Sequence, residues 1–208
     1  MISVQGLRHR YGDRQVLALD VWQAAAGEHW LVLGASGSGK TTLLCILGGL
    51  LRASAGRVAV GGEDLGALSG PALDRFRGRR VGFVPQKLHL IGSLTVEDNL
   101  LLAQYLAGMG QDRARVHEVL GALGLADRAQ ARPAELSHGQ AQRVAIGRAV
   151  VNRPQLILAD EPTANLDDAH CAQAVELLES QAAACGATLV VATHDQRVRA
   201  RFEKRIAL

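Results

Sequence analysis

Aromatic residues, cysteine and lysine are all scarce in this sequence. Only 3% of the 208 residues are aromatic whereas 48% are hydrophobic, so the buried core must be mainly aliphatic. The three cysteines, Cys45, Cys171 and Cys185, lack the spacing of metal ligands, which indicates free thiols in a reducing compartment. There are three lysines, so each one merits attention, and Lys40 proves to be chemically informative.

Long apolar runs are also missing. No stretch approaches the ~20 apolar residues that a membrane-spanning helix needs. The N-terminus has no basic segment followed by an apolar block, so we expect no secretory signal and a cytoplasmic protein. The net charge of +3 could suit nucleic acid or an anionic membrane surface, but the charges are spread along the chain. A solvated basic surface explains them, and we expect no nucleic-acid partner.

Strands alternate with helices at both ends of the sequence, and this pattern predicts a mainly parallel α/β sheet. The first strands are expected at Ile2–Tyr11 and Val16–Gln23, with a turn at Gly12 and Asp13. Between 87 and 151 the pattern predicts helices and no strand. We therefore expect one domain, in which a helical lobe (87–151) is inserted into a core formed by 1–86 and 152–208.

The most specific motif is a glycine-rich loop that follows the expected strand His29–Leu33. It matches the phosphate-binding pattern G-x-x-x-x-G-K-[ST]. Its residues are Gly34, Ala35, Ser36, Gly37, Ser38, Gly39, Lys40 and Thr41. Glycines let backbone N–H groups approach a triphosphate, and the following helix directs its positive end toward it. Lys40 would reach the β- and γ-phosphates and Thr41 would bind Mg²⁺; the alternative is an ordinary Gly/Ser-rich turn.

Two acidic residues, Asp160 and Glu161, directly follow the apolar run Leu156–Ala159. Ligands of parallel sheets collect at the carboxyl ends of the strands. Asp160 is therefore a candidate to hold Mg²⁺ through its water shell, and Glu161 to orient and deprotonate an attacking water. A solvated acidic turn is the alternative, and the phosphate-binding loop argues against it.

A third motif, Leu136-Ser137-His138-Gly139-Gln140, begins an expected helix. Ser137 and Gln140 fit a capping box, which is a purely structural explanation. The same helix start, with free N–H groups and a serine hydroxyl, is also suited to an anion. Both interpretations can hold together.

Taken in order, these motifs resemble those of the ABC family of ATP-binding subunits over essentially the whole chain. The resemblance implies that Tyr11 stacks on adenine and that the loop Gly34–Thr42, with Thr42 included, binds the phosphates of ATP. It implies that Gln86 senses Mg²⁺ and the γ-phosphate, and that His194 holds the transferring phosphoryl group. It also implies that Ser137, Gly139 and Gln140 form the family signature. The run Ala164-Asn165-Leu166-Asp167 resembles the loop that crosses the dimer interface. Tyr11 could instead be an ordinary strand aromatic, and Asp167 could cap the next helix.

The resemblance further implies a RecA-like P-loop NTPase core with a small N-terminal antiparallel β lobe. It implies an Mg²⁺-dependent ATPase that closes head to tail on ATP as a dimer, expected to be a homodimer. An integral membrane permease would dock beside residues 86–110, whose apolar side chains are expected to be partly exposed. The phrase Asp160–Asp167 resembles the subgroup for lipoprotein release, macrolide export and cell-division mechanotransmission, on the cytoplasmic face of the inner membrane. His138 departs from the family, which usually has glycine there.

Two rival functions are weighed against this interpretation. ABC ATPases for DNA repair or chromosome structure carry coiled-coil or zinc insertions before the signature, and this sequence has neither heptads nor cysteine clusters there. A nucleotide-operated switch with little turnover would not need both Glu161 and His194.

Overall fold

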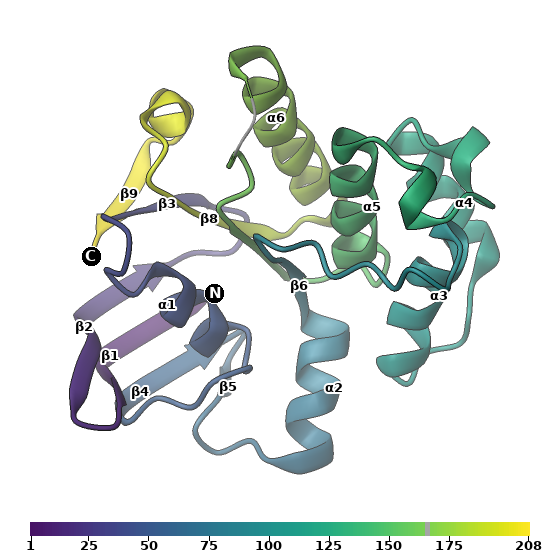
Figure 1. The fold of residues 1–208 in the computed structure, drawn as a ribbon. Coiled ribbons are helices and arrows are strands. Elements are labelled where there is room, and N and C mark those ends of the chain that lie inside the picture. Colours follow the sequence, from purple (N-terminus) through teal and green to yellow (C-terminus); the bar gives the residue numbers. More distant parts are fainter. Residues whose placement is uncertain (165–166) are drawn as a thin grey trace.

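A computed structural model describes residues 1–164 and 167–208. The chain begins with a four-stranded antiparallel sheet in the order β2-β1-β4-β5. These strands are β1 (Ile2–Tyr11), β2 (Arg14–Ala24), β4 (Ala55–Val60) and β5 (Glu63–Asp64). The first two form a hairpin whose turn contains Gly12 at φ 56°, a left-handed conformation that glycine adopts without strain. This sheet forms one corner of the molecule (Figure 1).

The central sheet has five parallel strands in the order β6-β7-β8-β3-β9. They are β3 (His29–Leu33), β6 (Val81–Val84), β7 (Leu156–Asp160), β8 (Thr188–Thr193) and β9 (Lys204–Ala207). Every residue of β7 and β8 is buried, as expected for central strands with both faces covered. All five strands run the same way, so their carboxyl ends meet along one edge of the sheet.

Six α-helices and three short 3₁₀ helices are present in the part of the chain that the structure describes. The α-helices are α1 (Lys40–Leu47), α2 (Gly70–Arg80), α3 (Val96–Leu106), α4 (Arg113–Ala122), α5 (His138–Val150) and α6 (Asp168–Cys185). The 3₁₀ helices are η1 (Ala126–Arg128), η2 (Pro133–Glu135) and η3 (Gln196–Arg201). Helices α3, α4 and α5 gather on one side of the molecule, away from the antiparallel sheet (Figure 1). Among the described residues, no helix is both long and apolar enough to cross a membrane.

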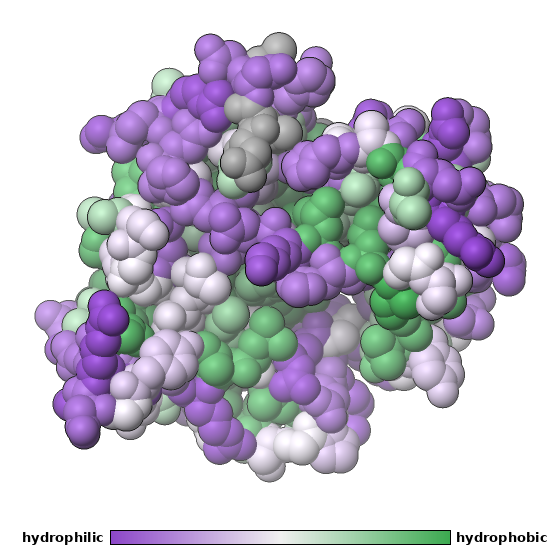
Figure 2. Space-filling view, viewed as in Figure 1, coloured by the Kyte–Doolittle hydropathy of each residue, from purple (hydrophilic) through white to green (hydrophobic). Residues whose placement is uncertain are grey.

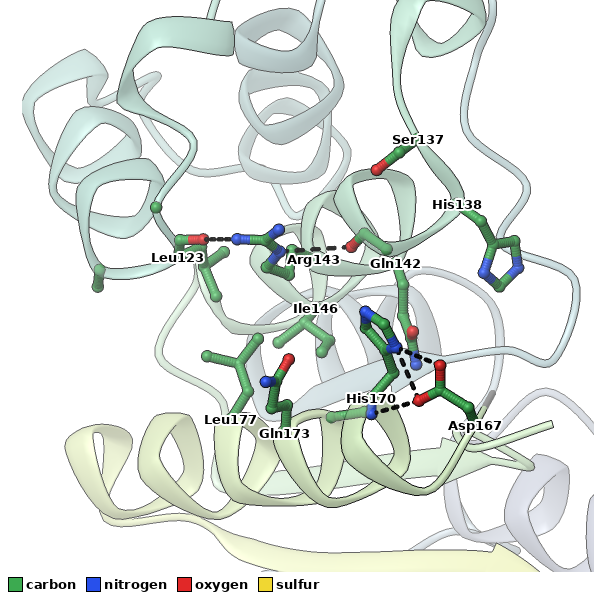
Figure 3. A pocket seen from close by; sticks show the side chains of 14 residues that line it. Leu123, Ser137, His138, Gln142, Arg143, Ile146, Asp167, His170, Gln173 and Leu177 are labelled. Atoms are coloured by element: carbon green, nitrogen blue, oxygen red, sulfur yellow. Dashed lines mark hydrogen bonds and ion pairs between the residues drawn. The ribbon is translucent and has the colours of Figure 1, made fainter. Parts of the chain in front are cut away.

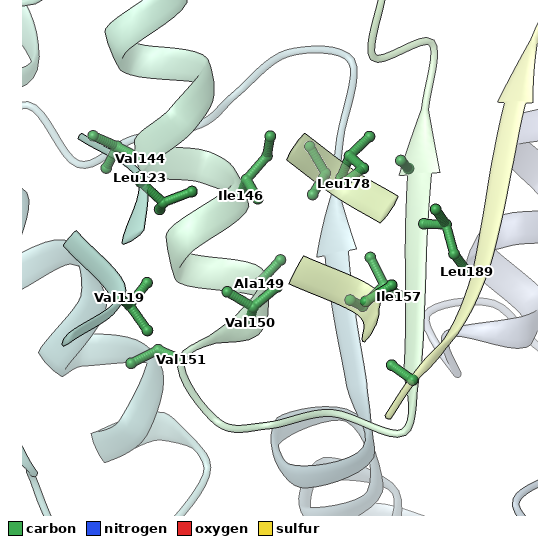
Figure 4. Close-up of a cluster of buried hydrophobic side chains, with 14 of the residues drawn as sticks. Val119, Leu123, Val144, Ile146, Ala149, Val150, Val151, Ile157, Leu178 and Leu189 are labelled. Atoms are coloured by element: carbon green, nitrogen blue, oxygen red, sulfur yellow. The ribbon is translucent and has the colours of Figure 1, made fainter. Parts of the chain in front are cut away.

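The core consists of two clusters on opposite faces of the central sheet. Alternate residues of β7 contribute to each: Ile157 and Ala159 to one cluster, Leu156 and Leu158 to the other. The first cluster joins α3–α6 to β7 and β8 (Figure 4), and the second joins α1 to the antiparallel sheet. The sheet is therefore fixed from both faces, and its carboxyl edge is a rigid platform.

The segment 86–110 was expected to be partly exposed, and this expectation is only partly right. Ile91, Tyr105 and Leu106 are exposed, at 40%, 66% and 69%. Val96, an apolar residue of the same segment, is instead fully buried in the cluster around α3 and α5. Viewed as in Figure 1, apolar patches open on the surface around α3–α5, whereas the surface over α6 is mostly hydrophilic (Figure 2).

Candidate nucleotide site

The phosphate-binding loop (residues 34–42) connects β3 to α1, as the sequence predicts. Gly39 caps the start of α1 at φ 98°, and a Cβ there would lie 2.5 Å from the Val16 carbonyl oxygen of β2. A Cβ at Gly34 would lie 2.2 Å from Ser38 Oγ. Glycine is thus required at position 39, where the backbone leaves no room for a side chain, and Gly34 is closely packed against Ser38. The loop forms the bend that presents backbone N–H groups at a helix start.

Lys40 folds back over its own loop. Its Nζ donates to the carbonyl oxygens of Gly34 at 2.8 Å and Ala35 at 3.1 Å, and lies 3.4 Å from Glu161 Oε1. Its side chain is only 7% exposed. A buried ammonium needs such partners, and they hold it beside the loop where an anion would replace them.

Asp160 ends β7 and faces the start of α1. Thr41 Oγ1 donates to Asp160 Oδ2 at 2.8 Å. Burial raises the pKa of Asp160, and the nearby Glu161 charge adds to the rise, although the Thr41 hydrogen bond opposes it. Asp160 Oδ1 and Ser38 Oγ are buried without a hydrogen-bond partner among the described residues. A hard divalent cation would satisfy the unpaired carboxylate oxygen of Asp160, and a phosphate would accept a hydrogen bond from the unpaired Ser38 hydroxyl.

Glu161 turns away from the sheet with φ 48°, a conformation unusual for a side chain of this size. Its Oε2 accepts from Thr193 Oγ1 at 2.8 Å, and its Oε1 lies 2.9 Å from His194 Nδ1. Burial would raise the pKa of Glu161, but the hydrogen bonds from His194 and Thr193 outweigh it and leave the pKa lowered. The carboxylate is therefore ionised at neutral pH and fixed in a strained position, as functional groups often are.

Tyr11 and Gln86, two further candidate site residues, belong to other parts of the fold, since Tyr11 ends β1 and Gln86 follows β6. Tyr11 is 54% exposed at the end of β1 and packs edge-to-face against His9, with ring centroids 4.8 Å apart. The partner strand β2 contains Val16, whose carbonyl oxygen lies close to Gly39 of the phosphate-binding loop. Gln86 is exposed two residues beyond β6, and Val84 of that strand pairs with Ala159, directly before Asp160. Both side chains are exposed to solvent.

The signature segment lies elsewhere, at the start of α5. Ser137 Oγ accepts from Gln140 N at 3.2 Å and Gln140 Oε1 accepts from Ser137 N at 2.9 Å, so the predicted capping box is confirmed. Ser137, His138 and Gly139 line a groove of about 900 Å³ whose other walls come from α4 and α6 (Figure 3). The phosphate-binding loop contributes nothing to this lining. The helix start therefore borders a groove that the chain's own phosphate-binding loop does not line.

The segment after Glu161 joins these two regions. Gln142 of α5 donates to the Pro162 carbonyl oxygen in the buried interior. Asp167 caps α6 by accepting from His170 N at 2.9 Å, so the structural alternative for this residue is confirmed. Asn165 and Leu166, which belong to the segment predicted to cross a dimer interface, lie outside the described residues.

The fold and this edge of the sheet define a class of protein. A glycine-rich loop with a buried lysine, beside a strand that ends in two acids, is the arrangement of a P-loop nucleotide hydrolase. The ABC transporter family model matches residues 20–164, and the chain belongs to that family. It is an ATP-binding ATPase, and the RecA-like α/β fold expected from the sequence is confirmed.

Known proteins match the chain from end to end. The lipoprotein-releasing system ATP-binding protein LolD of Chromohalobacter salexigens is 39% identical over 214 residues, which cover 100% of this chain and 90% of LolD. The macrolide export ATP-binding/permease protein MacB of Escherichia coli O157:H7 is 41% identical, but this chain spans only 33% of its length. The solved dimeric structure of the ATP-binding cassette MJ0796 with ADP and Pi has a TM-score of 0.89 at 33% identity, covering 100% of this chain and 94% of that one. The predicted resemblance to the lipoprotein-release and macrolide-export subgroup is confirmed.

Sequence reasoning did not find several residues that shape the site. Thr193 donates a hydrogen bond to Glu161. Arg197 donates to Asp195, the residue that follows His194. Thr193 is the last residue of the apolar strand β8, so no signal in the sequence marks it as a hydrogen-bonding partner of Glu161.

Proposed function

We propose that this chain is the ATP-hydrolysing subunit of a membrane transporter and that it works as a head-to-tail dimer. One observation carries the proposal: the capped helix start at Ser137 borders a groove that the chain's own phosphate-binding loop does not line. A second copy, turned by a two-fold axis, would bring its ATP to that helix start. Ser137, Gly139 and Gln140 would then bind the γ-phosphate and ribose of the partner's nucleotide.

The residues at the sheet edge divide the work of hydrolysis. Lys40 leaves the Gly34 and Ala35 carbonyls to bind the phosphates, together with backbone N–H groups of the loop from Gly34 to Thr42. Glu161 accepts a proton from the attacking water, since it is ionised and firmly oriented. His194 orients the same carboxylate and the transferring phosphoryl group, and Tyr11 stacks on the base.

Thr41, Asp160 and Gln86 are the residues that would hold Mg²⁺. Within the part of the chain that the structure describes, one buried Asp160 oxygen has no hydrogen-bond partner, and the Thr41 hydroxyl donates to the other oxygen of the same carboxylate. A bound Mg²⁺ would neutralise charge on the β- and γ-phosphate oxygens. The donor set is all oxygen, which suits this cation.

The helical segment 87–151 is proposed as a lobe that moves against the core formed by 1–86 and 152–208. Gln86 joins the two, so the state of the γ-phosphate would set the position of α3. An integral membrane permease would dock there, against the exposed side chains of Ile91, Tyr105 and Leu106. The chain would then be peripheral on the cytoplasmic face of the inner membrane, and the LolD and MacB relatives favour export or mechanotransmission.

Nucleotide-dependent dimerisation tests the proposal. The Glu161→Gln variant with saturating ATP and Mg²⁺ should elute as a dimer in size-exclusion chromatography, because ATP joins the two chains. The same protein without nucleotide should elute mainly as a monomer. Lys40→Ala is the matched control, and it should stay monomeric in both conditions. A Glu161→Gln protein that binds ATP and stays monomeric would contradict the two-chain function of the isolated subunit.

A further inference from the structure

Arg197, in η3, joins two acidic side chains from different elements. Its Nε donates to Asp195 Oδ1 at 2.9 Å and its Nη2 to Asp195 Oδ2 at 2.7 Å. Its Nη1 donates to Asp168 Oδ1 at 2.7 Å. The Arg197 hydrogen bonds hold the pKa of Asp195 well below its usual range, so this carboxylate is charged at any physiological pH. A forked guanidinium is suited to this two-sided contact, and a lysine ammonium is not.

One end of this bridge leads to the candidate catalytic carboxylate. The Asp195 backbone N donates to Thr193 Oγ1 at 3.0 Å, and Thr193 Oγ1 in turn donates to Glu161 Oε2 at 2.8 Å. Thr163 Oγ1 also donates to Asp195 Oδ2 at 3.0 Å, which ties the segment after Glu161 to the same carboxylate. Displacing Asp195 would therefore displace both hydrogen-bonding partners of Glu161, Thr193 and the adjacent His194.

The other end leads to the start of α6. Asp168 is the first residue of that helix and directly follows Asp167, which lines the groove at the start of α5. In the proposed dimer this is the place where the partner chain arrives. The Asp168 carboxylate is 91% exposed, so its pairing with Arg197 is the outer and weaker link of the bridge.

We propose that Arg197 is a positioning residue that links the dimer-facing start of α6 to the geometry of Glu161 and His194. The link makes Glu161 and His194 adopt their working positions when the partner chain contacts the start of α6. This inference rests on the proposed two-chain function. Arg197 is not among the groups proposed to hold the nucleotide, so its effect is on turnover and on communication between the two sites rather than on ATP binding.

A matched control exists on the same two elements. Arg201 of η3 pairs with Glu179 of α6 at 2.7 Å, eleven residues further along the helix and roughly 16 Å from Asp168 at 1.5 Å per residue. Arg201→Gln breaks a similar ion pair between η3 and α6 without touching the chain of bonds to Glu161. A merely structural role for Arg197 would make the two substitutions equivalent.

The experiment compares Arg197→Gln, Arg197→Lys, Asp168→Asn and Arg201→Gln in steady-state ATPase assays with purified protein, with melting temperatures measured alongside. Arg197→Gln should lower kcat roughly 5- to 30-fold, the range expected for misplacement of a catalytic group, with KM for ATP within about twofold. Arg197→Lys should recover part of the loss. Asp168→Asn leaves the Asp195 clamp intact and should mainly lower the Hill coefficient for ATP toward one. Arg201→Gln should leave kcat and the Hill coefficient unchanged.

Three results would overturn the inference: equal losses in Arg201→Gln and Arg197→Gln, a raised KM with unchanged kcat in Arg197→Gln, or parental cooperativity in Asp168→Asn. If Arg197→Gln does not fold, the Hill coefficient of Asp168→Asn decides alone. Failure of the two-chain function is separate, since it would appear as a monomeric Glu161→Gln protein whatever Arg197 does. The double variant Glu161→Gln/Arg197→Gln should still dimerise with ATP.

Discussion

Replacing Glu161 with glutamine separates hydrolysis from binding, and the structure gives the size of each effect. The amide keeps an oxygen for Thr193, which donates at 2.8 Å, and for the His194 N–H at 3.3 Å. It replaces the other oxygen, which faces His194 Nδ1 and Lys40, by an NH₂ group. One charge-assisted hydrogen bond and one buried ion pair are lost, so the free energy of unfolding of the nucleotide-free protein should fall by about 1–2 kcal/mol.

The effect of Glu161→Gln on kcat should be much larger than its effect on stability. An amide does not accept the proton of an attacking water, and loss of a general base costs roughly 10²–10⁴-fold in kcat, which is about 3–5 kcal/mol of barrier. ATP affinity should be unchanged or higher, because Lys40 no longer has a carboxylate competing with the phosphates.

Phosphate release measures kcat, binding of a fluorescent ATP analogue measures affinity, and thermal unfolding measures stability. Glu179→Gln removes a carboxylate from an ion pair outside the site and should keep the parental rate. A Glu161→Gln protein that hydrolyses ATP at more than about a third of the parental rate would show that Glu161 is not the general base.

Three further outcomes are expected. Burial raises the pKa of Asp160, so the contribution of this residue to stability is present at low pH and lost as pH rises through that pKa. At pH 7 Asp160→Asn should therefore stabilise the nucleotide-free protein by about 1 kcal/mol, or about 2–4 °C in melting temperature. The same substitution should abolish Mg²⁺-dependent hydrolysis. His138→Gly should leave ATPase activity within a few-fold, since no step depends on this imidazole, and a collapse in rate would assign it a role. A cysteine at Ile91 or Tyr105 should crosslink in native membranes to an integral membrane protein; crosslinks to soluble proteins alone would count against permease docking at α3.

Much of the fold is predictable from local patterns in the sequence. The strands Ile2–Tyr11 and His29–Leu33 begin and end at the expected residues, because turn residues or a change of period mark both limits. The capping box at Ser137 is predictable for the same reason, since its two partners are only three residues apart.

Features that depend on distant parts of the chain were not predictable. Neither the sheet order nor the pairing of β3 with β9 follows from local patterns. The residue types of Lys40, Asp160 and Glu161 indicated a nucleotide site, but not the folded-back lysine or the positive φ of Glu161. Arg197 resembles any other surface arginine in the sequence, and only its two acidic neighbours in space distinguish it.

The position of β3 in the sheet has a consequence for how the protein is made. This strand carries the phosphate-binding loop at its end, yet both of its neighbours, β8 and β9, come from the other end of the sequence. On the ribosome β3 and the loop that follows it emerge early, and β3 has no strand to pair with until β8 and β9 have been synthesised. The position in the sheet that holds the phosphate-binding loop therefore depends on contacts between residues far apart in the sequence, which form late in folding.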